Sequence, residues 1–294
     1  MHEAIGYRIL SLGLRVGLGV AICVSAARAQ QAPKPKTPTE ADMYCSGLTT
    51  DQAVPGDSYI ISGENSEYKI SFHPQDFVYI DRGGEQGVKI GDEFEVTRPV
   101  HELMPTKWFK WQSQLEKAMG THYADIGRLR VVRVQAKTST AALGLSCDMM
   151  QRGDIIRPFS PRPVPTYHST PFDPFAPPSG KKTAMIVDTK NFGMLSGSQR
   201  IVFVNLGSAQ GVQVGDYFRV FRYQGSHNEL VYPINGTAYK VYGFGGAPAI
   251  YLWDNLPRQV MGEGIVLRTG PNSSTVQLTF SREEIFAGDY VELE

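Results

Sequence analysis

Four aspartates that each follow a glycine are the residues of this chain whose spacing could do chemistry. They stand in the pairs Gly91-Asp92, Gly153-Asp154, Gly215-Asp216 and Gly288-Asp289. Carboxylates at repeated positions could bind a metal ion or serve as a general acid and base. A glycine with a positive φ, followed by an aspartate that accepts backbone N–H bonds, is also what a tight turn requires. We favour the second interpretation and predict that these eight residues shape turns and bind no metal.

The other residues that catalysis would require do not form a recognisable set. The histidines are scattered, without a His-Glu-x-x-His pattern or a nearby carboxylate cluster that would bind zinc. There is no Gly-x-Ser-x-Gly elbow and no phosphate-binding loop, and Cys147 has no base near it in the sequence. We therefore predict a protein that is not an enzyme and that needs no cofactor. The alternative, a secreted hydrolase of cell-wall polymer, would need two carboxylates facing one cleft.

Aromatic residues offer better candidates for a binding surface. All three tryptophans fall in two segments, 99–125 and 223–260, that interrupt otherwise similar stretches of the chain. In the first segment apolar side chains recur at helical spacing, which predicts a short helix over 107–119 with two indoles on one face. The rings of both segments could stack on a sugar, anchor a protein partner, or fold back as small hydrophobic cores. The candidate binding residues are Trp108, Trp111, Tyr239, Tyr242, Phe244, Tyr251 and Trp253.

An internal repeat indicates the elements that must position these residues. Residues 78–98 match residues 202–222 at 10 of 21 positions. A second similarity follows, between 127–156 and 262–291, and it keeps the same order of motifs. Two copies with a shared order of motifs indicate two homologous domains.

Each copy has the pattern of a small β domain. Short apolar or alternating runs, rich in β-branched and aromatic residues, are separated by glycine-containing turns. This predicts a mainly β fold of two tandem small β-barrel-like domains, at 42–157 and 182–294, with a short helix inserted in the first and a long loop in the second. Asp92 and Asp216 then lie in different domains, which makes them poor partners for hydrolysis.

Residues 158–181 are predicted to form an extended linker between the domains. Eight prolines occur from Pro158 to Pro178, which favours polyproline II conformation. Four aromatic residues are interleaved with them and could anchor the linker on a domain surface. The alternative is a loosely tethered spacer.

The start of the chain indicates export. Residues 1–29 combine basic residues, a short apolar run and small residues at Ala27-Arg28-Ala29, which is typical of a cleaved signal peptide. The polar, proline-rich residues 30–41 predict a disordered leader. Removing the signal leaves 29 − 3 = 26 basic and 29 − 1 = 28 acidic residues, a charge of −2 that gives no footprint for nucleic acid. No later apolar run is long enough to span a membrane, so we expect a periplasmic or secreted protein at the envelope.

Two cysteines remain after this processing, Cys45 and Cys147. In an oxidising compartment an even pair predicts a disulfide, here between the start and the end of the first domain. Such a bridge closes a loop of about 100 residues, for which chain-entropy arguments suggest about 4–5 kcal/mol of stabilisation. The alternative is two buried free thiols.

The stretch from Phe203 to Val220 carries a family resemblance. Its pattern, apolar-apolar-x-Leu-Gly-Ser-x-x-Gly-Val-x-Val-Gly-Asp-x-Phe-x-Val, resembles the C-terminal domain of flagellar assembly protein T, a protein of the flagellar H-ring. The resemblance includes the terminal Gly-Asp-x-Val at 288–291 and covers the core of both copies but neither insertion. It implies a small β-rich periplasmic module that works by protein contact, without catalysis. The whole chain also looks like secreted envelope proteins.

The signal, the repeat, the missing catalytic motifs and the placement of the indoles together predict a non-catalytic interaction or scaffold protein of the periplasm or cell envelope. We expect it to bind an envelope protein or a peptidoglycan-type glycan through its aromatic insertions, and not to bind nucleic acid. Besides the hydrolase, the alternative is a structural subunit of a flagellar or envelope ring.

Overall fold

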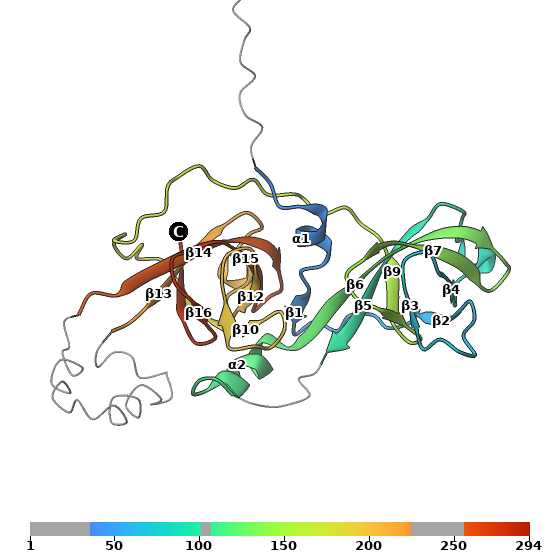
Figure 1. Ribbon diagram of the computed structural model, residues 1–294, viewed down its shortest axis with the longest axis horizontal. Coiled ribbons are helices and arrows are strands. Elements are labelled where there is room, and N and C mark those ends of the chain that lie inside the picture. The colour runs from blue at the N-terminus through green and yellow to red at the C-terminus, as the bar shows by residue number, and fades with distance from the viewer. Residues whose placement is uncertain (1–35, 101–106, 225–255) are drawn as a thin grey trace, which may run out of the picture. The chain divides into compact units, whose positions relative to one another are not determined.

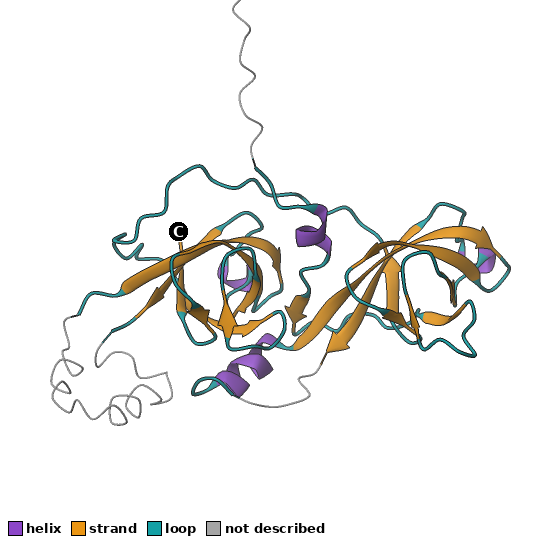
Figure 2. Ribbon diagram, in the orientation of Figure 1, coloured by secondary structure: helices purple, strands orange, loops and turns teal. Residues whose placement is uncertain are grey.

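The computed structural model in Figure 1 describes residues 36–100, 107–224 and 256–294. Within these ranges the protein is mainly β, with antiparallel sheets and short helices (Figure 2). This agrees with the predicted fold class at the level of a mainly β protein that contains a barrel. We call residues 42–157 the first half of the protein and residues 182–294 the second half.

The second half contains a closed antiparallel barrel (Figure 1). Its strands follow the order β10, β12, β15, β14, β13 and β17. β17 pairs with β10 and completes the ring. Side chains such as Val202, Phe218 and Leu278 are fully buried inside it. The strands span Thr183–Thr189 (β10), Ile201–Val204 (β12), Tyr217–Arg222 (β13), Gln259–Thr269 (β14), Ser274–Ser281 (β15) and Tyr290–Leu293 (β17).

The first half has an antiparallel sheet with the equivalent strand order, β2, β4, β7, β6, β5 and β9, and β1 pairs with β6. Between β2 and β9 the described residues show a single bridge, Tyr59 with Ile155, in place of a ladder. The strands span Leu48–Thr50 (β1), Ile60–Gly63 (β2), Phe77–Ile80 (β4), Glu93–Val100 (β5), Thr121–Val134 (β6), Ser139–Ser146 (β7) and Ile155–Pro158 (β9).

Smaller elements repeat as well. A two-stranded sheet of β3 (Ser71–Phe72) and β8 (Met150–Gln151) in the first half corresponds to β11 (Leu195–Ser196) and β16 (Ile285–Phe286) in the second. The 3₁₀ turns η1 (Gly84–Gln86) and η2 (Ser208–Gln210) are equivalent too.

The identities shared by the two 3₁₀ turns have a structural cause. Gln86 Oε1 accepts the N–H of Gly83 at 2.8 Å, and Gln210 Oε1 accepts that of Gly207 at 2.8 Å. A Cβ atom at Gly83 would lie 2.5 Å from a backbone oxygen, and one at Gly207 would lie 2.4 Å from another. Glycine is therefore required at both positions, because the neighbouring backbone comes too close for any side chain.

Regular structure begins before the predicted end of the leader. Helix α1 (Glu40–Tyr44) starts with a capping box, in which Thr39 Oγ1 accepts the N–H of Asp42 at 3.2 Å and Asp42 Oδ2 accepts that of Thr39 at 2.8 Å. Glu40 and Ala41, the last two residues of the predicted leader, therefore lie in a helix, because a Thr-x-x-Asp cap follows the prolines. The predicted signal peptide lies outside the described residues.

Helix α2 (Gln112–Met119) is shorter than the helix predicted over 107–119. Trp111 has a φ of 70°, in the left-handed region, so it is the N-cap and not part of the helix. The two indoles therefore do not share one helical face, and that prediction is wrong.

The buried side of α2 packs against the second half and not against its own sheet. We call the contact of α1, β1 and α2 with the second half the docking interface. Its hydrophobic core consists of Met43, Met119, Val187, Ile201, Phe203, Tyr217, Ile265 and Leu267, with Leu115 packed against it.

Polar contacts surround this core. Thr275 Oγ1 donates to the carbonyl of Gly47 at 3.1 Å, and Arg268 Nη1 donates to Asp125 Oδ1 at 3.0 Å. Gln112, which is 2% exposed, donates from Nε2 to the carbonyl of Val187 at 2.9 Å. Shared apolar burial and satisfied buried polar groups therefore join the two halves.

The proline-rich linker is anchored and does not form a loose spacer. Arg162 Nη2 donates to Glu95 Oε2 at 2.9 Å in the first half. Tyr167 Oη donates to Gln277 Oε1 at 2.8 Å in the second, and burial raises the pKa of Tyr167 to about 12. Further along, the ring of Phe172 lies 4.7 Å from that of Phe280.

Candidate functional site

The Gly-Asp pairs have the geometry of turns. The four glycines have φ values of 95° (Gly91), 85° (Gly153), 96° (Gly215) and 102° (Gly288). Asp92 Oδ2 accepts the N–H of Lys89 at 2.9 Å, and Asp216 Oδ2 accepts that of Gln213 at 2.8 Å. These carboxylates close turns in equivalent places, as a residue that accepts a nearby backbone N–H bond does.

Asp154 and Asp289 have an additional role that the sequence did not reveal. Asp154 is 2% exposed and accepts hydrogen bonds from Arg98 Nε at 2.6 Å and from Arg98 Nη2 at 2.8 Å. Asp289 is 3% exposed and accepts hydrogen bonds from Arg222 Nε and Nη2, both at 2.7 Å. The hydrogen bond to Asp154 raises the pKa of Arg98. Each buried carboxylate is thus held in a bidentate clamp, which leaves neither free for proton transfer.

The predicted aromatic residues have different environments. Trp111 is 58% exposed beside α2. Trp108 is half-buried, and its Nε1 donates to the carbonyl of Phe192 at 3.3 Å, so it contributes to the contact between the halves. The other candidates, Tyr239, Tyr242, Phe244, Tyr251 and Trp253, lie outside the described residues.

A disulfide fixes α1 to the first half. Cys45, directly after α1, is bonded to Cys147, directly after β7, with their Cα atoms 5.3 Å apart. Arg162 reinforces this position, because its Nη1 donates to the carbonyl of Met43 at 2.8 Å. Helix α1 is therefore a fixed wall and not a mobile arm.

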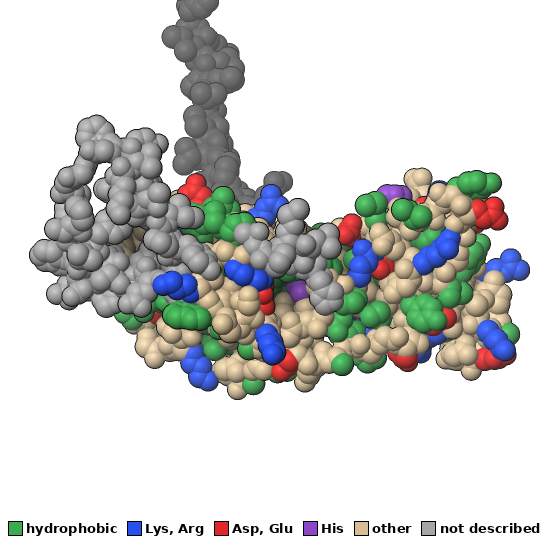
Figure 3. All heavy atoms as spheres, turned by 90° about the horizontal axis from the view of Figure 1, so that it is seen from below, with side chains coloured by type: hydrophobic (Ala, Val, Ile, Leu, Met, Phe, Trp, Pro, Cys, Tyr) green, Lys and Arg blue, Asp and Glu red, His purple; other side chains and the backbone are tan. Residues whose placement is uncertain are grey.

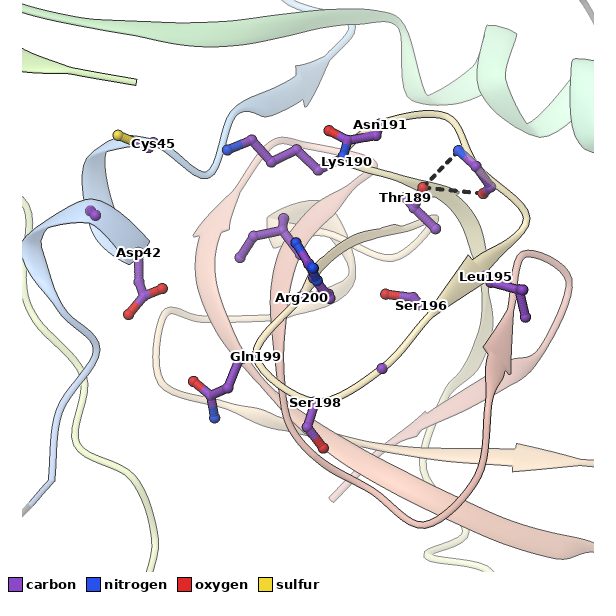
Figure 4. Close-up of a pocket in the computed structure, with 14 residues that line it drawn as sticks. Asp42, Cys45, Thr189, Lys190, Asn191, Leu195, Ser196, Ser198, Gln199 and Arg200 are labelled. Atoms are coloured by element: carbon purple, nitrogen blue, oxygen red, sulfur yellow. Dashed lines mark hydrogen bonds between the residues drawn. The ribbon is translucent and has the colours of Figure 1, made fainter. Parts of the chain in front are cut away.

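Opposite this wall, residues 189–201 of the second half complete a cleft of about 680 Å³, which we call the α1 cleft (Figure 4). The segment connects β10 to β12 and contains β11, whose pairing with β16 ties it to the barrel. Thr189 Oγ1 accepts the N–H of Gly193 at 2.9 Å and donates to its carbonyl at 3.1 Å. The lining side chains labelled in Figure 4 are Asp42, Cys45, Thr189, Lys190, Asn191, Leu195, Ser196, Ser198, Gln199 and Arg200.

The cleft contains polar groups without internal partners. Among the described residues, the side chains of Lys190, Asn191 and Arg200 form no hydrogen bond or ion pair, and all three are exposed. Ser196 Oγ is buried and has no hydrogen-bond partner within the ranges that the structure describes. Ser198 differs, because its Oγ lies 3.0 Å from Ser281 Oγ.

His122 lies at the docking interface, where the positive charge of Lys190 acts on its imidazole. Its ring contacts Phe203, with centroids 4.5 Å apart, and Nδ1 lies 3.1 Å from Thr49 Oγ1. Burial lowers the pKa of His122 to about 4, with a smaller contribution from Lys190, while Asp125 acts in the opposite direction. The imidazole is therefore neutral near pH 7 and has a structural environment.

Searches of the described residues for a metal-binding cluster and for a membrane-spanning helix find neither. They contain no group of three His, Cys, Asp or Glu side chains that could hold a metal ion. No helix in the described ranges is both long enough and apolar enough to cross a membrane. Comparison with known protein families and with curated proteins finds no match for this chain. Among the described residues that line the α1 cleft, Asp42 is the one carboxylate.

The two cations of the cleft were not among the site residues predicted from the sequence. Lys190 and Arg200 flank a loop rich in glycine and serine between two predicted strands, and that position was the available signal. It is a weak signal, because single exposed cations beside loops are common on protein surfaces.

Proposed function

We propose that the protein is a non-catalytic binding protein of the periplasm or cell surface, which holds an envelope component in the α1 cleft. One observation carries this proposal, namely that Lys190 and Arg200 have no partner among the described residues although they line a concave site. Convergent polar groups in a concavity are typical of ligand sites. The Gly-Asp carboxylates, in contrast, are bonded to the chain itself.

The construction of the cleft supports the same proposal. One wall, α1, is fixed to the first half by the disulfide, whereas the other belongs to the second half. The docking interface therefore sets the width of the cleft, and a site held open in advance loses less entropy when it binds. In this proposal both halves are copies of one small barrel, and the disulfide fits an oxidising compartment.

Binding to isolated envelope material tests the proposal. The mature protein should sediment with purified peptidoglycan sacculi, and the double variant Lys190→Gln, Arg200→Gln should sediment less. Chromatography of the supernatant should show no released fragments. Fragments that appear in proportion to protein would favour the hydrolase, and a protein that stays in the supernatant would contradict the binding proposal.

A second candidate, a structural subunit of an envelope ring, is favoured by one surface of the first half. Ile61 and Val132 are 38% and 41% exposed there. They lie at register shifts equivalent to those of Val187 and Leu267, which the docking interface covers in the second half. An apolar face left open can accept another copy, and head-to-tail contacts of this kind build rings or filaments. Sedimentation velocity at rising concentration should then show self-association that Val132→Glu abolishes, whereas a concentration-independent monomer would exclude this candidate.

A further inference from the structure

The two cations of the α1 cleft project from neighbouring strand ends. Lys190 follows β10 and Arg200 precedes β12, and Lys190 N–H donates to the carbonyl of Ile201 at 3.1 Å. β10 and β12 pair up to this point, so the two residues start side by side at one end of the barrel. Both side chains line the same cleft, and neither has a partner among the described residues, which points to an anionic group in the ligand.

The charge of the whole lining limits how many anionic groups the ligand carries. Lys190 and Arg200 contribute +2 and Asp42 contributes −1, so the part of the lining that the structure describes has a formal charge of +2 − 1 = +1. Asp42 extends from α1, on the other side of the cleft (Figure 4). Its carboxylate would repel a polyanion that fills the cleft, whereas a ligand with one carboxylate matches the excess charge.

The remaining lining fits the neutral part of a saccharide. The Asn191 amide is exposed at the cleft and has both donors and an acceptor, which matches the hydroxyl groups of a sugar. Leu195 is 54% exposed at the same site and offers an apolar surface to the C–H face of a sugar ring.

We infer that the α1 cleft binds a saccharide that bears a single carboxylate, with the carboxylate between Lys190 and Arg200 and a sugar hydroxyl on Asn191. This inference rests on the proposed function and names the ligand class of the same site. It commits to a glycan rather than to an acidic protein segment, because the neutral part of the lining matches hydroxyl groups.

Two disaccharides that differ in the carboxylate test the inference by calorimetry with the mature protein. The probes are N-acetylglucosaminyl-N-acetylmuramic acid, which has a lactyl carboxylate, and di-N-acetylchitobiose, which lacks it. The acidic probe should bind about tenfold more tightly, since one charge-assisted contact is of this order. Lys190→Gln and Arg200→Gln should each remove most of that difference. Lys137→Gln and Arg133→Gln, which change exposed cations of the first half, should leave it intact.

Each outcome separates this inference from the proposed function. Equal affinity for both probes, or binding of neither by a protein that still sediments with sacculi, would overturn the carboxylate inference and leave the binding function standing. Failure to bind the probes together with failure to sediment would overturn both. A protein that binds acetyl-Glu-Glu-amide but not the acidic disaccharide would show that the site takes an acidic peptide, which also overturns the inference.

Discussion

The two halves of the chain share a framework and differ in what covers one face of it. The strand pairings shift register at equivalent bulges, so Ile61 corresponds to Val187 and Val132 corresponds to Leu267. Val187 and Leu267 are 0% and 1% exposed, whereas Ile61 and Val132 are 38% and 41% exposed. The same position is therefore core in one copy and surface in the other, because α1 and α2 cover this face of the sheet only in the second half.

The loops after the equivalent strands β2 and β10 differ in chemistry. In the first half this loop exposes Tyr68 and Ile70, which are 88% and 86% exposed. In the second half it carries Lys190 and Arg200 beside the α1 cleft. The repeated elements provide the scaffold, and recognition is expected where the copies have diverged.

Removal of the disulfide should have the largest effect and should separate the halves most clearly. The bond spans 102 residues, all within the first half, and the second half has no cysteine. Cys45→Ser with Cys147→Ser should lower the free energy of unfolding by about 4–5 kcal/mol, because the unfolded chain regains the entropy of a long loop. Urea unfolding followed by fluorescence measures the loss. A loss below about 1 kcal/mol would mean that the docking interface already fixes α1.

Acid should weaken the docking interface through His122. Its pKa is about 4 in the folded protein and 6.5 when unperturbed, so the unfolded chain binds the extra proton first as pH falls. Stability is expected to be complete above pH 6.5, to decline between 6.5 and 4, and to change no further below 4 on account of this group. The loss should be about 3 kcal/mol. His122→Gln should flatten that part of the profile of unfolding free energy against pH, and an unchanged profile would exclude His122 as its source.

Truncation at the two equivalent bulges tests the comparison directly. Leu267→Ala removes a buried side chain from the core of the docking interface and should destabilise the protein by about 2–3 kcal/mol. Val132→Ala is the matched control on an exposed surface and should cost less than about 0.5 kcal/mol. Thermal or urea unfolding of both variants measures this. Equal losses would show that the face of the first half is also covered in solution, as the ring candidate expects.

The sequence was sufficient to predict features that depend on local chemistry. The repeat and its short apolar runs indicate a mainly β fold, and the Gly-Asp pairs indicate turns, because a positive φ and a nearby acceptor are local requirements. Cysteine count and compartment were sufficient to suggest the pairing of Cys45 with Cys147.

Features that depend on contacts between the halves were not predictable in this way. Helical spacing placed Trp111 inside a helix, whereas its backbone turns just before α2 packs on the second half. Arg98 and Arg222 matched in the repeat, but their partners lie 56 and 67 residues away in sequence, so a single sequence gave no pairing. The α1 cleft joins segments separated by more than a hundred residues, and no local pattern specifies that meeting.

The two arginine clamps should give the smallest effect and the most sensitive comparison. Arg98→Lys and Arg222→Lys keep the charge but lose the bidentate fork, so each should cost about 1 kcal/mol. Equal costs are expected, because the two clamps have nearly the same distances and equally buried carboxylates. The halves nevertheless differ in the strand pairing beside the clamp. In the second half β10 and β17 form a ladder, whereas in the first half a single bridge, Tyr59 with Ile155, joins the ends of β2 and β9. If Arg98→Lys lowers the free energy of unfolding in urea by more than Arg222→Lys does, the clamp of the first half compensates for the shorter strand pairing beside it. The two clamps would then have the same geometry but contribute differently to stability.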